Sequence, residues 1–416
     1  MQSNNRRYIP LLDVLRASAA LWVLLYHVVT ILRPVDEPRR TLVGSDNPVM
    51  IVLSQGWLAV SLFVMLSGYS LSLGLTKGDI DWVAYLKARW LRVAPLYLVV
   101  LFLGLMTAAR RPSLESLFAA ITMLPLPGAF EPHPWLATAW SVKVELVLYL
   151  CIPALVYAVR RYKPVPLMAM AGALGLVLLL AMHQTTSMVD ILYSGVPGRL
   201  AEFTVGFALG YAGRTFPLRL RRVAIAVGCA GFAAVTLVAN RSGGFYDLPG
   251  STRLALYLAT LLLGGLLLAA VDQRPTPSGS RVVAAVSAVG SWSYSTYLWH
   301  MIVIKVVSVE LMTPLQSTLG VQAALAVGGA LTVGIVMAMS WASFNLIERP
   351  FLSLRPTYVR VAAAIEPAGV APGLRPATAR THLLAGPVAR SAVPRTRTAP
   401  VAEVVGSIRT AGDLSP

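Results

Sequence analysis

Residues 9–31, IPLLDVLRASAALWVLLYHVVTI, decide the fold of this chain. The stretch is long enough to cross a bilayer as one helix, because a span needs about 20 mainly apolar residues. Three ionisable residues interrupt it: Asp13, Arg16 and His27. A charge near the bilayer centre costs about 2.5–3.5 kcal/mol on insertion scales, so such residues usually face a protein interior. About 16 Å of helical rise, and about 20° beyond three full turns, separate Arg16 from His27, which places both on one face.

These ionisable residues could serve helix packing or chemistry. Asp13 and Arg16 stand at i, i+3 and can neutralise each other near the cytoplasmic end of the helix. That pairing leaves His27 without a partner, and an imidazole in hydrocarbon needs either polar neighbours or a chemical task. The other motifs of the chain have to decide between packing and chemistry.

The composition places the whole chain in a membrane. Of its 416 residues, 56% are hydrophobic and 13% charged, and its mean hydropathy is +0.68, outside the range of soluble domains. We expect an all-α, polytopic membrane protein with about ten transmembrane helices. The first helix carries internal charges and has no small-residue cleavage site after it, so we expect it not to be a removable signal peptide. Apolar runs predict spans at residues 9–32, 49–75, 93–109, 136–158, 166–183, 199–213, 223–240, 252–271, 286–309 and 320–347.

The basic residues predict how these helices are oriented. With ten spans, roughly three times as many Lys and Arg residues fall on the side of the two termini as on the other side. Short cytoplasmic loops collect such residues, so we expect both termini to be cytoplasmic. The net charge of +17 then belongs to membrane orientation, and we expect no nucleic-acid partner, since no basic patch lies on a soluble domain.

Several functional classes lack their usual signatures. Cys151 and Cys229 both lie in apolar runs and indicate neither a disulfide nor a metal site. The chain has no phosphate-binding P-loop, no H-E-x-x-H zinc motif and no G-x-S-x-G nucleophile motif. We therefore expect no bound metal and no ATP-driven pump, zinc protease or serine hydrolase.

Two regions differ in composition. Residues 8–353 form the expected membrane domain. Residues 354–416 are rich in Pro, Ala, Arg and Thr and contain no run long enough to span. Such a segment cannot bury enough apolar surface to offset its ordering entropy, so we expect a disordered, basic cytoplasmic tail that lies against the anionic inner leaflet.

Polar motifs recur inside the apolar runs. Phe63, Ser67, Gly68 and Tyr69 end the second run, where small residues let another backbone approach closely. Near the end of the last run, Glu348 is expected to pair with cytoplasmic loops. Further polar, aromatic and small residues in the sixth and ninth runs are Arg199, Glu202, Phe203, Gly206, Ser291, Ser293, Tyr294, Tyr297 and His300.

A pair of arginines precedes the third run. Arg89 and Arg92 stand at i, i+3 at the expected cytoplasmic mouth of this span, with Pro95 marking the helix start. Their planar guanidinium groups suit phosphate oxygens, although two inside arginines also satisfy the positive-inside rule. The sequence does not choose between these two roles.

The fourth run holds Glu145 in the sequence Trp140-Ser141-Val142-Lys143-Val144-Glu145. Lys143 can reach the interface, but Glu145 is too deep to do so. A buried carboxylate must pair with a cation or with hydrogen-bond donors, and Arg16 is one candidate.

In this order and spacing, the motifs resemble those of the acyltransferase 3 family of integral-membrane O-acyltransferases. The resemblance covers residues 8–352. It rests on Leu15-Arg16-Ala17 with His27, on Phe63 to Tyr69, on Arg89-x-x-Arg92 with Pro95 and Tyr97, and on Trp140-Ser141-x-x-x-Glu145; Val142 stands where Leu is common.

The resemblance implies transfer of an acyl group, usually acetyl, from cytoplasmic acyl-CoA to a hydroxyl of a carbohydrate-containing acceptor. That acceptor is a cell-surface polysaccharide or a small glycoside such as a macrolide. By the same resemblance His27 is the essential catalytic histidine, Arg16 its companion and Glu145 the motif glutamate, while Arg89 and Arg92 bind the acyl-CoA. It implies acetyl-CoA as co-substrate with no permanently bound cofactor. High Ala and Arg usage, with no mitochondrial-type leader, favours a multi-pass location in the bacterial inner membrane.

Chemical reasoning agrees with this resemblance. A neutral imidazole with a pKa near 6.5 can take the proton of a sugar hydroxyl that attacks a thioester, and an acyl-histidine intermediate is a second route. The competing class is a proton-coupled secondary transporter for a sugar or drug, with Asp13, Arg16, His27 and Glu145 as a proton relay. Transporters usually show internal repeats, and none is evident here.

Overall fold

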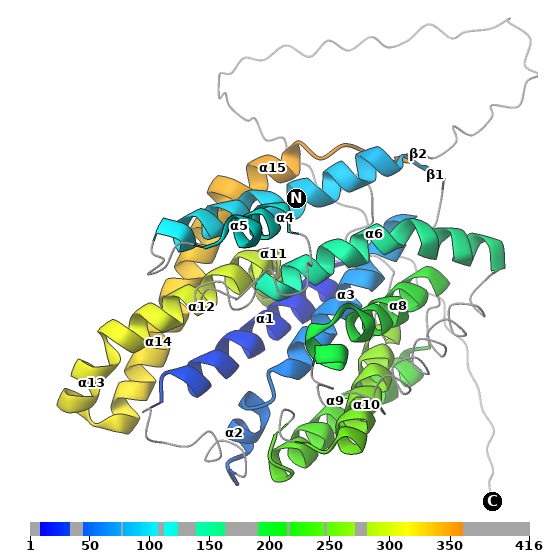
Figure 1. Cartoon of the computed structure of the whole chain (residues 1–416). Coiled ribbons are helices and arrows are strands. Elements are labelled where there is room, and N and C mark those ends of the chain that lie inside the picture. Colours follow the sequence, from blue (N-terminus) through cyan, green and yellow to red (C-terminus); the bar gives the residue numbers. More distant parts are fainter. Residues whose placement is uncertain are drawn as a thin grey trace, which may run out of the picture. The chain divides into compact units, whose positions relative to one another are not determined.

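The computed structural model describes residues 9–33, 45–75, 78–106, 112–123, 139–162, 190–213, 217–244, 248–270 and 281–360. These residues are almost entirely helical (Figure 1). The helices are α1 (Pro10–Ile31), α2 (Pro48–Leu53), α3 (Trp57–Leu75), α4 (Trp82–Met106), α5 (Leu114–Thr122), α6 (Ala139–Tyr162), α8 (Val196–Ala212), α9 (Leu218–Arg241), α10 (Gly250–Ala269), α11 (Arg281–Ser291), α12 (Ser293–Glu310), α13 (Met312–Leu319), α14 (Val321–Ser343) and α15 (Arg349–Ser353). Two π-helical turns, η3 (Asp190–Ser194) and η5 (Phe344–Glu348), adjoin α8 and α14.

Seven helices in the described part of the chain are long and apolar enough to cross a membrane, and the bent pair α12–α13 brings the number to eight. The expected all-α, multi-pass membrane fold is therefore confirmed. The count of ten and the cytoplasmic placement of the termini stay predictions. The span expected at residues 166–183 lies outside the described residues.

The spans expected at residues 49–75 and 286–309 are each two helices in the structure, α2 with α3 and α11 with α12. The expected start of the third span is also wrong. Helix α4 begins at Trp82 rather than near residue 93, so Arg89, Arg92 and Pro95 lie inside it and Pro95 does not mark its start. The prediction counted only the apolar run, whereas the helix continues N-terminally through a segment whose Tyr85 and Ala88 are buried. Prolines inside membrane helices are tolerated where neighbouring helices satisfy the freed backbone groups.

The centre of the bundle is built on α1 and α3, both blue in Figure 1. Helix α3 packs most extensively against α8. A Cβ atom at Gly68 would lie 2.1 Å from the carbonyl oxygen of Phe203, and one at Gly206 would lie 1.9 Å from that of Met65. The close backbone approach predicted from the small residues of α3 is thus confirmed.

The chain returns to the bundle after its last long helix. Beyond α15, strand β2 (Val359–Arg360) pairs antiparallel with β1 (Asp79–Ile80), which lies between α3 and α4. Residues 354–360, which the sequence assigns to the tail, are therefore ordered against the membrane domain. The rest of the tail, residues 361–416, lies outside the described residues.

Candidate active site

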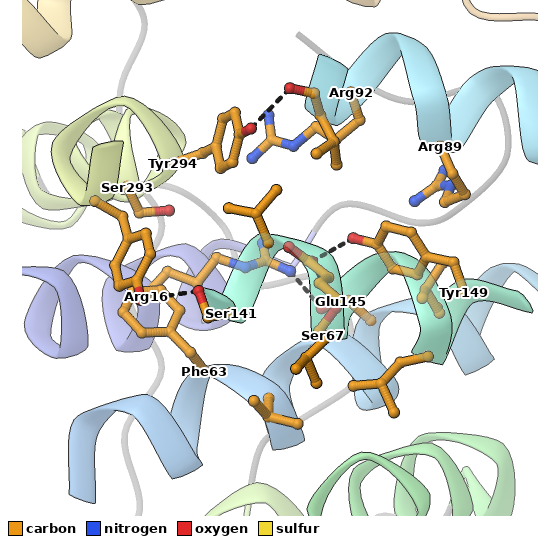
Figure 2. Close-up of a pocket in the computed structure, with 18 of the residues that line it drawn as sticks. Arg16, Phe63, Ser67, Arg89, Arg92, Ser141, Glu145, Tyr149, Ser293 and Tyr294 are labelled. Carbon is orange, nitrogen blue, oxygen red and sulfur yellow. Dashed lines mark hydrogen bonds between the residues drawn. The ribbon is translucent and has the colours of Figure 1, made fainter. Parts of the chain in front are cut away.

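A cavity of about 290 Å³ is lined by residues of α1, α3, α4, α6, α8, α11, α12, η5 and α15 and of the segment that follows α15. This volume is close to the lower end of the range for small-molecule sites. Four of the five residues expected at the site line it, namely Arg16, Arg89, Arg92 and Glu145 (Figure 2). They come from three helices, so only the packing of the bundle brings them together.

Arg16 enters the cavity from α1. Its guanidinium group forms the expected ion pair with Asp13, at 2.7 Å, and donates a second hydrogen bond to the Ser70 hydroxyl of α3, at 2.5 Å. Both charged side chains are partly exposed to the cavity, Arg16 by 16% and Asp13 by 12%. Asp13 therefore offsets the charge of Arg16 and orients it, as the i, i+3 spacing predicted.

Arg89 is held by aromatic rings. Its guanidinium carbon lies 5.6 Å from the ring centre of Tyr85, 5.8 Å from that of Tyr149 and 5.6 Å from that of Tyr358. It also donates a hydrogen bond to the Tyr358 hydroxyl, at 3.3 Å. Aromatic faces attract a guanidinium without neutralising it. Arg89 makes no ion pair with the carboxylates of the described residues, so its positive charge is available to an anion in the cavity.

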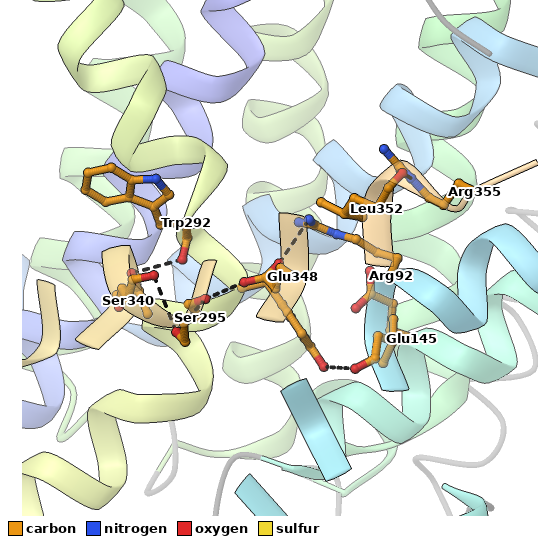
Figure 3. A network of polar contacts seen from close by, with 12 residues as sticks. Arg92, Glu145, Trp292, Ser295, Ser340, Glu348, Leu352 and Arg355 are labelled. Carbon is orange, nitrogen blue, oxygen red and sulfur yellow. Dashed lines mark hydrogen bonds and ion pairs between the residues drawn. The ribbon is translucent and has the colours of Figure 1, made fainter. Parts of the chain in front are cut away.

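Arg92, one helical turn further along α4, does have a carboxylate partner. It lies 3.2 Å from Glu348 in the π-helical turn η5, and its guanidinium carbon lies 5.7 Å from the ring centre of Tyr294. Ser295 donates a hydrogen bond to the same carboxylate (Figure 3). Glu348 is 2% exposed. The expected charge pair of Glu348 is thus present, but its partner Arg92 lies inside α4 and not in a loop.

Glu145 lines the cavity from α6. Its carboxylate accepts hydrogen bonds from the Ser67 hydroxyl, at 3.3 Å, and from the Tyr149 hydroxyl. Arg16, the cation considered from the sequence, pairs with Asp13 instead. Because Tyr149 also packs on Arg89, the tyrosine links the carboxylate of Glu145 to the second arginine of the cavity.

His27 is placed apart from these four residues. It is not among the described residues that line the cavity, although it shares a helix with Arg16. Its Nδ1 atom lies 3.0 Å from the Val23 carbonyl oxygen, and its ring centre lies 5.0 Å from that of His300 in α12. The rise of about 16 Å between Arg16 and His27 explains the separation, since residues on one face of a helix can lie at different depths.

His300 connects His27 to the wall of the cavity. It is 1% exposed, and its Nδ1 atom lies 2.7 Å from the carbonyl oxygen of Tyr297. The Tyr297 hydroxyl accepts a hydrogen bond from Ser141, at 2.8 Å, and both of these residues line the cavity. The sequence suggests no role for His300, and only the packing of α12 against α1 shows that it lies beside His27.

Helix α8 carries a buried ion pair for which the sequence suggests no role. Arg199 and Glu202 of α8 lie 2.6 Å apart, and both side chains are 1% exposed. Arg199 packs on Tyr193, with 4.4 Å from its guanidinium carbon to the ring centre, and on Trp140, at 5.8 Å. The i, i+3 spacing of two opposite charges in an apolar helix was the available signal. Breaking a pair buried this deeply leaves an uncompensated charge, so we assign it a structural role at the cavity wall.

Comparison with known proteins decides the family. Residues 9–341 match the family model described as an acyltransferase domain, acyltransferase 3. The chain belongs to this family. The membership that the motifs indicated is thereby confirmed, and the match covers every helix that lines the cavity from α1 to α12.

The relatives are bacterial. The chain is 24% identical over 338 residues to O-acetyltransferase OatA of Staphylococcus aureus, which covers 71% of this chain and 50% of the relative. It is 23% identical over 310 residues to the exopolysaccharide production protein ExoZ of Rhizobium meliloti, covering 71% of this chain and 90% of the relative. The aligned region is thus about half the length of the staphylococcal relative. No solved structure matches the chain.

Proposed function

We propose that this protein is a membrane O-acyltransferase that moves an acetyl group from acetyl-CoA to a hydroxyl of a carbohydrate acceptor. The observation that supports it best is the single cavity in which Arg16, Arg89, Arg92 and Glu145 meet, in a chain of the acyltransferase 3 family. The names of the relatives, an O-acetyltransferase and an exopolysaccharide production protein, favour a cell-surface polysaccharide over a small glycoside as acceptor. The proposed location is the bacterial inner membrane.

The chemistry assigns the residues to two tasks. The acceptor hydroxyl oxygen attacks the thioester carbonyl carbon, the carbon–sulfur bond breaks, and the proton of the hydroxyl ends on the departing CoA thiol. Arg89 and Arg92 bind the donor through its phosphates, because guanidinium forks match phosphate oxygens. His27 takes the proton as general base, with Arg16 and Glu145 ordering the polar groups on the donor side of it.

The test is release of the CoA thiol by purified protein. Wild-type protein in detergent is given acetyl-CoA with and without an acceptor polysaccharide, and free thiol is measured over time. Cys151 and the exposed Cys229 are first replaced by Ala, because a thiol reagent would otherwise report them. Acceptor-dependent thiol release supports the proposal. No release, together with pH-gradient-driven sugar uptake in proteoliposomes, would instead establish the transporter.

A further inference from the structure

The segment that follows the last long helix is built into the cavity. We call residues 354–360 the C-terminal strap. It is fastened to the bundle by the β1–β2 pairing, by a hydrogen bond from the Asp81 amide to the Tyr358 carbonyl oxygen at 2.9 Å, and by an ion pair between Arg360 and Asp81 at 2.9 Å. These contacts join residues about 280 positions apart in the sequence, so the strap belongs to the tertiary structure of the membrane domain.

Two strap side chains, Arg355 and Tyr358, line the cavity. Tyr358 is 3% exposed and packs edge-on against Tyr85, with 5.4 Å between ring centres. It supplies both an aromatic face and a hydroxyl acceptor to Arg89. The strap therefore forms one side of the aromatic enclosure that holds Arg89.

Arg355 adds a third cation beside Arg89 and Arg92. Figure 3 shows it with Leu352 near Arg92, and its Nε atom donates to the Leu352 carbonyl oxygen at 3.0 Å. Burial, together with repulsion from Arg92 and Arg89, lowers the pKa of Arg355 to about 10. The group stays charged at neutral pH, since that value is still well above 7. Like charges that repel one another in a recess are stabilised by an anion bound between them.

The balance of charges around the cavity also favours a bound anion. Of these three arginines, only Arg92 has a carboxylate partner among the described residues, Glu348. The remaining carboxylate close by, Glu145, accepts hydrogen bonds from Ser67 and Tyr149. Among the described residues, Arg89 and Arg355 thus line the cavity without an ion pair, next to Arg92, whose side chain is 27% exposed.

We propose that the C-terminal strap completes the donor site, with Arg355 contacting a phosphate of the CoA headgroup alongside Arg89 and Arg92. The inference rests on the proposed function, because it takes acyl-CoA as the donor. The group that Arg355 would bind is a phosphate of the nucleotide part of acyl-CoA. The proposal gives a specific task to a segment that composition alone assigned to a disordered tail.

The experiment measures binding of CoA, 3′-dephospho-CoA and pantetheine to purified protein by calorimetry, which needs no acceptor. We expect Arg355→Gln to weaken CoA binding about 10- to 100-fold, the range for one charge-assisted hydrogen bond, and to leave pantetheine binding unchanged. Arg355→Lys should lose less than Arg355→Gln, because a lysine ammonium still binds phosphate as a point charge although it lacks the planar fork. Tyr358→Phe, which removes one neutral acceptor from Arg89, should weaken CoA binding about fivefold.

Arg349→Gln is the matched control. Arg349 is exposed, lies six residues before Arg355, donates a hydrogen bond to Asn345 at 3.4 Å and is not among the described residues that line the cavity, so CoA binding should not change. Size-exclusion profiles show whether each variant is folded, and the lysine variant provides the comparison should the glutamine variant fail. Wild-type binding of CoA with equal binding by Arg355→Gln, or equal losses for CoA and pantetheine, would overturn the role of the strap alone. Absence of CoA binding by the wild type would overturn the proposed function as well.

Discussion

The two ends of α1 place their ionisable residues in different surroundings. At the N-terminal end, Arg16 is paired with Asp13, bonded to Ser70 and open to the cavity that also holds Arg89, Arg92 and Glu145. At the other end, His27 packs against His300 and lines no part of that cavity. Arg16 and His27, on one face of α1, thus lie in two separate regions, the cavity and the contact with His300.

This contrast indicates how the proposed reaction is divided between the two ends of α1. The arginine end suits the phosphates of the donor, because highly charged groups belong in a basic, partly hydrated recess. The histidine end suits proton transfer, because it is shielded from those charges. A pantetheine arm that extends from the first region toward the second would connect them. The predictions below test this division, beginning with the largest expected effect.

Replacement of His27 should abolish turnover and leave donor binding intact. A general base contributes about 10²- to 10⁴-fold, or about 3–5.5 kcal/mol, so His27→Ala should lower kcat by at least that range. His27→Gln keeps hydrogen bonding without basicity and should lose as much. Thiol-release kinetics and CoA calorimetry on the same preparations make the comparison. A folded glutamine variant with near-normal kcat would reduce the histidine to a packing role.

Replacement of the α4 arginines should weaken donor binding and change turnover less. Arg89→Ala or Arg92→Ala should raise KM for acetyl-CoA about 10- to 100-fold with a smaller change in kcat, since each removes a charge-assisted contact to the donor. Lysine should rescue poorly because it lacks the planar fork.

The control for this pair is Lys87→Ala, an exposed basic residue on the same helix, which should change neither constant. Unchanged donor kinetics in both arginine variants would assign Arg89 and Arg92 to membrane orientation.

Replacement of His300 tests whether the histidine end acts as a unit. We expect His300→Gln to lower kcat about tenfold with KM for acetyl-CoA unchanged, because it disturbs the placement of His27 without touching the donor site. His300→Asn places an amide near Nδ1 and can keep the contact to the Tyr297 carbonyl oxygen. Full activity in the asparagine variant would show that His300 only satisfies that carbonyl group.

The smallest effect is expected from cysteine labelling, which asks whether the two ends of α1 face opposite sides of the membrane. Val49, exposed on α2, reports the histidine end, and Ser353, exposed on α15, reports the arginine end. In a background without Cys151 and Cys229, an impermeant reagent applied from outside should label Val49→Cys and spare Ser353→Cys, with activity unchanged. Labelling of both from one side would contradict the topology.

Hydropathy determined a large part of this protein. The apolar runs established an all-α membrane fold and located α1, α6, α9, α10 and α14 to within a few residues. They could do so because the free-energy cost of placing backbone and charged groups in hydrocarbon depends on the residues of each segment alone. The Asp13–Arg16 pair was also predictable, since i, i+3 neighbours meet on any helix. The motifs and their order were enough to indicate the acyltransferase 3 family.

Which of these residues meet depends on the packing of the helices. Glu348 reaches Arg92 across 256 positions, and Tyr358 reaches Arg89 across 269. No periodicity encodes contacts at such separations, because they depend on how several helices pack. The same packing set His27 beside His300 rather than in the cavity with Arg16. It also turned seven residues of an apparently unstructured tail into a strap, since pairing with β1 and burial of Tyr358 supply the stabilisation that their own composition lacks.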